Sequence, residues 1–200
     1  QGSGATGSQH LLDDAALRRQ QQFIWRRAMS RHRAILTAIV LAGCAAKEGE
    51  MKTVDYVDID RFMGAWYVIG NIPTFVEKDI YNAVETYSLN DDGTIDTVFT
   101  FRRGCFDGKE KEYNPKGFVL DKQTNARWGM QFIWPVKSDY RIVYLDDEYT
   151  TTIIGRKKRD YVWIMARTPA IDEVEYARLV AMVEELGYDL SSLRRVPQQW

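Results

Sequence analysis

The sequence predicts an all-β domain of eight strands followed by one helix. From about residue 57 to residue 167, short segments of alternating polar and apolar side chains are separated by turn-forming residues. The segments are rich in Tyr, Trp, Phe, Val, Ile and Thr, which suit a pleated, half-buried surface. Eight strands at this spacing indicate either a sandwich or a closed antiparallel barrel, and the residues alone leave both open.

The strand boundaries follow from where the alternation starts and where turn residues interrupt it. Asn90-Asp91-Asp92-Gly93 and Asp146-Asp147-Glu148 have the composition of tight hairpin loops. We expect the strands at Trp66–Ile72, Tyr81–Leu89, Thr94–Arg102, Lys109–Val119, Ala126–Ile133, Asp139–Leu145, Thr150–Gly155 and Tyr161–Arg167.

One helix is expected after the last strand. Asp172 and Glu175 have the spacing of a capping box, and Gly187 stands where a helix commonly ends. Apolar residues at helical spacing give the segment one apolar face, formed by Val174, Ala177, Val180 and Ala181. We expect this face to pack on the outside of the β-structure.

A short apolar run precedes the domain. The ten residues Ala34–Gly43 follow a basic stretch and end in Leu41-Ala42-Gly43-Cys44. Ten residues cannot cross a bilayer core, which needs about 20, whereas this pattern is typical of a secretory signal. The ending resembles the lipobox of bacterial lipoproteins, which implies a signal peptide over 29–43 and acylation of Cys44. A short core helix that contains Cys44 is the alternative.

The segments around this signal complete the domain organisation. Residues 1–28 precede Met29, where a signal peptide would begin, and we expect an upstream extension that is absent from the mature protein. A cytoplasmic segment with a polar helix is the alternative. Residues 44–56 are predicted to be a lipidated tether and residues 57–200 the folded domain. Ala45 implies, by the sorting rule of these lipoproteins, a lipid-anchored protein of the outer membrane that faces the periplasm.

Histidine content and charge exclude several functional classes. His10 and His32 both precede Cys44, so the mature chain has no histidine. It therefore has no Ser-His-Asp or Cys-His nucleophilic site and lacks the commonest zinc and haem ligand. From Cys44 onward, 21 basic and 26 acidic residues give a net charge of −5, which argues against nucleic-acid binding. We expect no catalytic residue, no metal and no other cofactor.

Two short motifs at the ends of the β-region point to a known family. Gly64-Ala65-Trp66 resembles the Gly-x-Trp motif at the start of the first strand of lipocalins, and Arg167 matches the arginine of their last strand. Three further stretches are similar to bacterial outer-membrane lipocalins related to apolipoprotein D: Thr86–Leu89, Tyr140–Asp146 and Arg159–Ile164. The second family motif, usually Thr-Asp-Tyr, reads Ser138-Asp139-Tyr140 here.

The resemblance implies an eight-stranded antiparallel up-and-down β-barrel around one cavity, with a C-terminal α-helix packed outside. It implies that Gly64, Trp66 and Arg167 form the closed end, with the guanidinium over the indole face. It also implies that the cavity binds a fatty acid or a lysophospholipid.

The alternation of side chains along each strand predicts the cavity lining. If Trp66 points inward, Val68 and Gly70 on the same face of the strand also point inward. If Arg167 points inward, so do Met165 and Trp163. The expected ligand-binding residues are Glu85, Tyr87, Phe99, Trp128, Met130, Phe132, Tyr140, Ile142, Trp163 and Met165. An inward Glu85 is costly unless it is paired or wet, so it indicates a hydrated cavity or a partner in Arg102 or Arg127.

The open end of such a barrel is expected to be basic. In an up-and-down barrel, the loops after strands one, three, five and seven lie at the end opposite Trp66. They carry Arg102, Arg103, Lys137, Arg156, Lys157, Lys158 and Arg159, whereas acidic residues gather at the closed end. This polarity favours anionic lipid head groups or an anionic membrane surface.

These features predict a membrane-anchored lipocalin that binds an amphiphilic lipid for storage, transport or scavenging, without chemistry on the ligand. One alternative is an envelope interaction protein whose barrel is filled by its own side chains. The other is a lipid-modifying enzyme that exchanges protons through Glu85 with Tyr87 or Tyr140.

Overall fold

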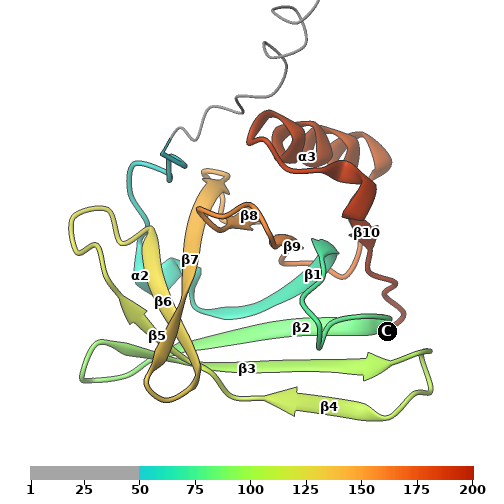
Figure 1. The fold of residues 1–200 in the computed structure, drawn as a ribbon, viewed down its shortest axis with the longest axis horizontal. Coiled ribbons are helices and arrows are strands. Elements are labelled where there is room, and N and C mark those ends of the chain that lie inside the picture. The colour runs from blue at the N-terminus through green and yellow to red at the C-terminus, as the bar shows by residue number, and fades with distance from the viewer. Residues whose placement is uncertain (1–49) are drawn as a thin grey trace, which may run out of the picture. The chain divides into compact units, whose positions relative to one another are not determined.

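The computed structural model describes residues 50–200, which form a closed antiparallel β-barrel with a helix against its outside (Figure 1). The helices are α2 (Ile59–Phe62) and α3 (Glu173–Glu185), followed by a 3₁₀ turn at Leu190–Ser192. The strands are β1 (Gly64–Ile72), β2 (Ile80–Leu89), β3 (Thr94–Arg103), β4 (Glu110–Tyr113), β5 (Lys116–Val119), β6 (Arg127–Ile133), β7 (Val136–Leu145), β8 (Thr151–Gly155), β9 (Val162–Ala166) and β10 (Arg194–Arg195).

The barrel closes because the first and last of its strands pair. The antiparallel neighbours follow the order β1-β2-β3-β5-β6-β7-β8-β9, and β9 returns to β1 with Tyr67 opposite Ala166. Both β4 and β5 pair with β3, so together they occupy the fourth of eight positions. The predicted eight-stranded barrel is confirmed, and the sandwich is excluded.

The fourth strand is interrupted, in contrast to the single strand expected over Lys109–Val119. The break falls at Asn114-Pro115, between β4 and β5. Proline has no N–H to donate to a strand ladder, and here its carbonyl oxygen accepts from the N–H of Thr97 at 3.1 Å. The two halves of the strand therefore pair with different parts of β3.

Apolar side chains gather on both sides of the barrel wall. One cluster fills the inside, and a second lies between the wall and α3, where Ile153 and Ile164 meet Leu179 and Val183. The predicted position of the helix outside the barrel is confirmed. Asp172 caps the helix as predicted, because its Oδ1 accepts from the N–H of Glu175 at 2.7 Å, whereas the Glu175 carboxylate accepts from Arg178 instead of completing a capping box.

The buried face of α3 differs from the expected one. Leu179 and Val183 are fully buried, whereas Val174, Ala177 and Ala181 are exposed. The larger side chains remove more apolar area from water, so the face that carries them turns toward the barrel.

Part of the predicted tether is docked on the barrel. The N–H of Val54 donates to the carbonyl of Ile142 at 3.0 Å, and Arg141 Nη1 donates to the carbonyl of Met51 at 3.1 Å. Met51 is 3% exposed. Residues 51–54 are therefore not a free linker, because the backbone of Met51 and of Val54 bonds to the domain, whereas Tyr56 is 61% exposed. The expected signal peptide, Cys44 and residues 1–28 lie outside the described residues.

Strand direction defines the two ends of the barrel. The closed end contains α2 and the start of β1. The other end, called the mouth below, contains the connections β1–β2, β3–β4, β6–β7 and β8–β9. Within residues 50–200, every helix is too short or too polar to cross a bilayer.

Candidate functional site

Arg167 and Trp66 form the closed end of the barrel. The Arg167 Cζ atom lies 3.8 Å from the centroid of the Trp66 ring. Its guanidinium also donates to the carbonyl oxygens of Arg61, Phe62, Ala65 and Tyr149 at 2.7–3.3 Å. Because these carbonyls belong to α2, β1 and the β7–β8 loop, one side chain ties three segments together. The predicted guanidinium-over-indole geometry is confirmed.

Gly64 is needed beside this contact. Its φ is +91°, a backbone conformation that residues with a Cβ rarely adopt. A Cβ at this position would lie 3.4 Å from Arg167 Nη1. The glycine of the Gly-x-Trp motif therefore allows the turn from α2 into β1.

Aromatic rings fill the half of the barrel next to the closed end. Trp128 stacks on Tyr140 with ring centroids 5.2 Å apart, and Phe62 meets Trp128 edge-on at 5.4 Å. Phe62, Trp66 and Trp128 are inaccessible to solvent. This half has a packed aromatic floor, so a bound molecule would have to lie nearer the mouth.

The structure places nearly all the predicted lining residues inside. The inward orientation is confirmed for Glu85, Tyr87, Phe99, Trp128, Met130, Tyr140, Ile142, Trp163 and Met165. Their role in binding remains a prediction. Glu85 and Trp163 are only partly buried although they face inward. Free space therefore lies next to them within the barrel.

Two inward positions were predicted wrongly because the strands contain bulges. The β6–β7 register shifts between Met130 and Ile133, and Phe132 is 55% exposed on the hairpin at the mouth. The β1–β9 register shifts between Val68 and Gly70, so Asn71 rather than Gly70 pairs with inward Trp163. A bulge adds one residue and reverses the alternation beyond it.

A polar cluster lies on the aromatic floor. The Tyr87 hydroxyl donates to Glu85 Oε2 and lies 2.8 Å from the Tyr140 hydroxyl. Burial raises the pKa of Glu85 to about 7; the Tyr87 hydrogen bond opposes this rise and the Glu77 charge adds to it. Burial also raises the pKa of Tyr87 and of Tyr140, so both hydroxyls stay protonated at neutral pH.

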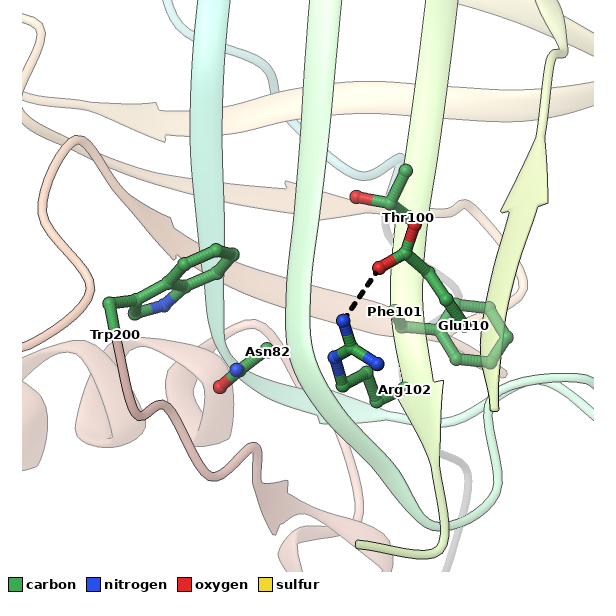
Figure 2. A pocket seen from close by; sticks show the side chains of 6 residues that line it. All are labelled: Asn82, Thr100, Phe101, Arg102, Glu110 and Trp200. Atoms are coloured by element: carbon green, nitrogen blue, oxygen red, sulfur yellow. Dashed lines mark hydrogen bonds and ion pairs between the residues drawn. The ribbon is translucent and has the colours of Figure 1, made fainter. Parts of the chain in front are cut away.

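Neither predicted arginine partner reaches Glu85. Arg102 forms an ion pair with Glu110 at 3.0 Å on the outer face, and Arg127 is exposed. Figure 2 shows this ion pair at a pocket that is also lined by Asn82, Thr100, Phe101 and Trp200. The partner of Glu85 is therefore the Tyr87 hydroxyl instead of a cation.

Glu77 is a second buried carboxylate, and the sequence analysis missed it. It lies in the β1–β2 loop, is 6% exposed and accepts from Trp163 Nε1 at 3.2 Å, Thr74 N at 3.0 Å and Asn71 Nδ2 at 3.4 Å. Burial raises its pKa. These bonds hold the loop against the inner wall near the mouth. Loop residues follow no alternation, so no sequence signal marks Glu77.

Large apolar side chains are exposed around the mouth. We call this group the apolar mouth surface, and its members are 55–82% exposed: Phe75, Phe132, Ile133, Trp134 and Val136. Monomeric soluble proteins rarely expose such residues together without an interaction role.

The predicted basic charges at the mouth are partly engaged. Arg103 donates to the carbonyl of Val76, and Arg156 pairs with Asp160 at 3.4 Å. Lys137 lies 3.5 Å from the centroid of the Phe118 ring. Among the described residues, the exposed side chains of Lys157 and Lys158 have no ion-pair partner. The mouth thus presents a smaller free positive charge than the sequence indicates.

Comparisons with known proteins agree with this architecture. Residues 57–198 match the Lipocalin-like domain family. Temperature-induced lipocalin-1 of Arabidopsis thaliana is 35% identical over 74% of this chain and 83% of its own length. Outer membrane lipoprotein Blc of Escherichia coli (strain K12) is 27% identical over 82% of this chain and 94% of its own.

A solved structure supports the fold alone. Insecticyanin from the tobacco hornworm Manduca sexta superposes with a TM-score of 0.59 at 15% identity, over 74% of this chain and 84% of that protein. The barrel, its closed end and the family match agree with one another. The chain belongs to the lipocalin family.

Proposed function

We propose that the chain binds one single-chain amphiphile, a fatty acid or a lysophospholipid, in the mouth half of its barrel. Lipocalins are in general binding or transport proteins for small hydrophobic ligands. The observation that carries the proposal is the free space beside Glu85 and Trp163, above the packed floor. Phe99, Phe101 and Met130 belong to the apolar cluster of the same interior and are themselves almost fully buried.

The length of the space suits a medium acyl chain. Glu85 and Ile80 pair with Phe99 and Arg103 on β3, which are four residues apart, about 14 Å along the strand at about 3.4 Å per residue. With a strand tilt of about 40°, this corresponds to about 10 Å along the barrel axis. Burying about eight methylenes contributes about 6 kcal/mol before ordering costs. Micromolar affinity corresponds to about −8 kcal/mol, so it also requires favourable contacts of the polar head group that offset the ordering costs.

A lysine near the mouth supports a tail-first orientation for fatty acids. Lys111 pairs with Phe101 in the β3–β4 ladder and is partly buried on the inward face of β4. It lies toward the mouth, whereas Glu85 lies deeper. Lys111 attracts a carboxylate head group and Glu85 repels it, so the acyl tail enters the barrel first.

The mouth also has the chemistry of a membrane contact. Aromatic and aliphatic side chains beside lysines are typical of segments that lie in a bilayer interface. The apolar mouth surface with Lys137, Lys157 and Lys158 has this composition. We propose that it rests on an anionic bilayer while acylated Cys44 anchors the chain at the outer membrane. The name of the Escherichia coli relative supports this location.

Native mass spectrometry of the whole chain tests the binding proposal. Titration with palmitic acid and with lysophosphatidylcholine should yield a one-to-one complex. Trp163→Ala should weaken that complex, and Trp134→Ala, which removes an exposed tryptophan, should not. Absence of any complex would favour the filled barrel. Chemical conversion of the lipid that Glu85→Gln abolishes would favour the enzyme.

A further inference from the structure

Glu85 offers an unused hydrogen-bond acceptor inside the barrel. Its Oε2 atom accepts from the Tyr87 hydroxyl. Within residues 50–200, its other carboxylate oxygen, Oε1, has no hydrogen-bond or ion-pair partner. A buried carboxylate is stabilised by hydrogen bonds from several donors. Glu85 can therefore accept at least one more hydrogen bond.

Thr97 provides a second, independent polar group at the same level. It is 2% exposed, and its Oγ1 has no hydrogen-bond partner. Thr97 pairs directly with Tyr87 across β2 and β3, and Phe99 pairs with Glu85. Side chains of directly opposed residues lie on the same face of a sheet, so the Thr97 hydroxyl faces the interior that contains the Glu85 cluster. Leaving a buried hydroxyl unpaired is costly, which indicates that a ligand group completes the site.

The charges around this cluster have one sign. Glu85 faces the tyrosine hydroxyls from β2 and β7, and Glu77 in the β1–β2 loop is the second carboxylate that acts on it. Arg167 is engaged by the carbonyls of the closed end, and Lys111 lies toward the mouth. The inner end of the cavity is therefore acidic and rich in acceptors, whereas its outer end has a lysine.

We propose that Glu85, Tyr87, Tyr140 and Thr97 form a hydrogen-bonding subsite at the inner end of the cavity, which receives a hydroxyl or ammonium group on the buried end of the ligand and disfavours a carboxylate there. The inference rests on the proposed lipid binding and adds to it a rule of ligand choice. A fatty acid binds only tail-first, whereas a long-chain alcohol or amine also binds head-first with its polar group at Glu85.

Calorimetric titration of the whole chain with decylamine, decanol and decanoate tests this rule. The three probes share one chain length and differ in the head group. At pH 8, above the pKa of Glu85 of about 7, the wild type should bind decylamine at least about tenfold more tightly than decanoate. Glu85→Gln should erase most of this preference, and Thr97→Val should weaken decanol binding several-fold.

A matched control separates the subsite from the overall negative charge of the protein. Glu112 is exposed on the outer face of β4, so Glu112→Gln removes the same charge away from the cavity and should leave all three affinities unchanged. An amine preference that survives in Glu85→Gln, or decanoate bound as tightly as decylamine by the wild type, would overturn the subsite and leave lipid binding intact. Failure of all three probes to bind would overturn both proposals.

Discussion

Replacing Glu85 with glutamine tests whether this carboxyl group is held in a poorly hydrated interior. Burial raises its pKa from 4.5 to about 7. A pKa change of one corresponds to about 1.4 kcal/mol, so this rise corresponds to at most about 3.5 kcal/mol. Glu85 is only partly buried, and water in the cavity screens its charge, so we expect Glu85→Gln to raise the free energy of unfolding by about 1–3 kcal/mol at pH 8.

The size of this effect depends on pH. Below pH 4.5 Glu85 is protonated in both the folded and the unfolded chain, and the two proteins should be equally stable. Between 4.5 and about 7 the unfolded chain releases the proton first, so the wild type loses stability as pH rises. Above about 7 the full difference is present. Glu77 is present in both the wild type and Glu85→Gln. The effect of its titration on the free energy of unfolding therefore largely cancels in the difference between the two proteins.

Urea denaturation at pH 4 and pH 8, followed by tryptophan fluorescence, measures this difference. Glu112→Gln serves as the control, because its side chain is exposed. Equal stability of the wild type and Glu85→Gln at pH 8 would refute the reasoning, and so would a less stable variant. Equal stability would mean that the cavity hydrates Glu85 as fully as bulk water does, and a less stable variant would mean that the hydrogen bond from Tyr87 outweighs the cost of burial.

Three further predictions concern the closed end, the floor and the mouth. Arg167→Ala should lower the free energy of unfolding by about 2–4 kcal/mol in urea denaturation, because the cation–π contact and the hydrogen bonds to carbonyls are lost together. Thr97→Val should raise it by about 1 kcal/mol in the same assay, because it removes a buried hydroxyl without a partner; a loss of stability would show that the hydroxyl is satisfied. Ile133→Ser with Trp134→Ser should reduce cosedimentation with anionic vesicles and leave the unfolding midpoint unchanged, since both side chains are exposed; unchanged cosedimentation would contradict a membrane contact at the mouth.

The alternation of side chains predicted the fold well because a barrel wall has one apolar inner face. On β3, Phe99 was predicted to face inward, and the structure confirms this together with its alternate neighbours Thr97 and Phe101, which are also buried. The closed end was predicted from the family resemblance. The residues alone did not distinguish a barrel from a sandwich, because that choice depends on the pairing of β1 with β9, which alternation does not specify.

The errors in the candidate site have two physical origins. Bulges in β1 and between β6 and β7 shift the alternation by one residue, which placed Gly70 and Phe132 inside and left Asn71 out. Tertiary contacts also decide the partners of a charged side chain. Glu85 is bonded to tyrosine instead of arginine, and Glu77 is buried by a loop that folds onto Trp163.

Quenching of tryptophan fluorescence by a fatty acid that is brominated along its chain tests the central claim most directly. Bromine quenches only rings in contact with it, and Trp163 lies in the mouth half of the interior while Trp66 and Trp128 lie in the packed floor. The account predicts saturable quenching at one fatty acid per chain, largely lost in Trp163→Phe and retained in Trp134→Phe. Absence of saturable quenching, or equal quenching in Trp163→Phe and the wild type, would contradict a ligand in the mouth half of the barrel.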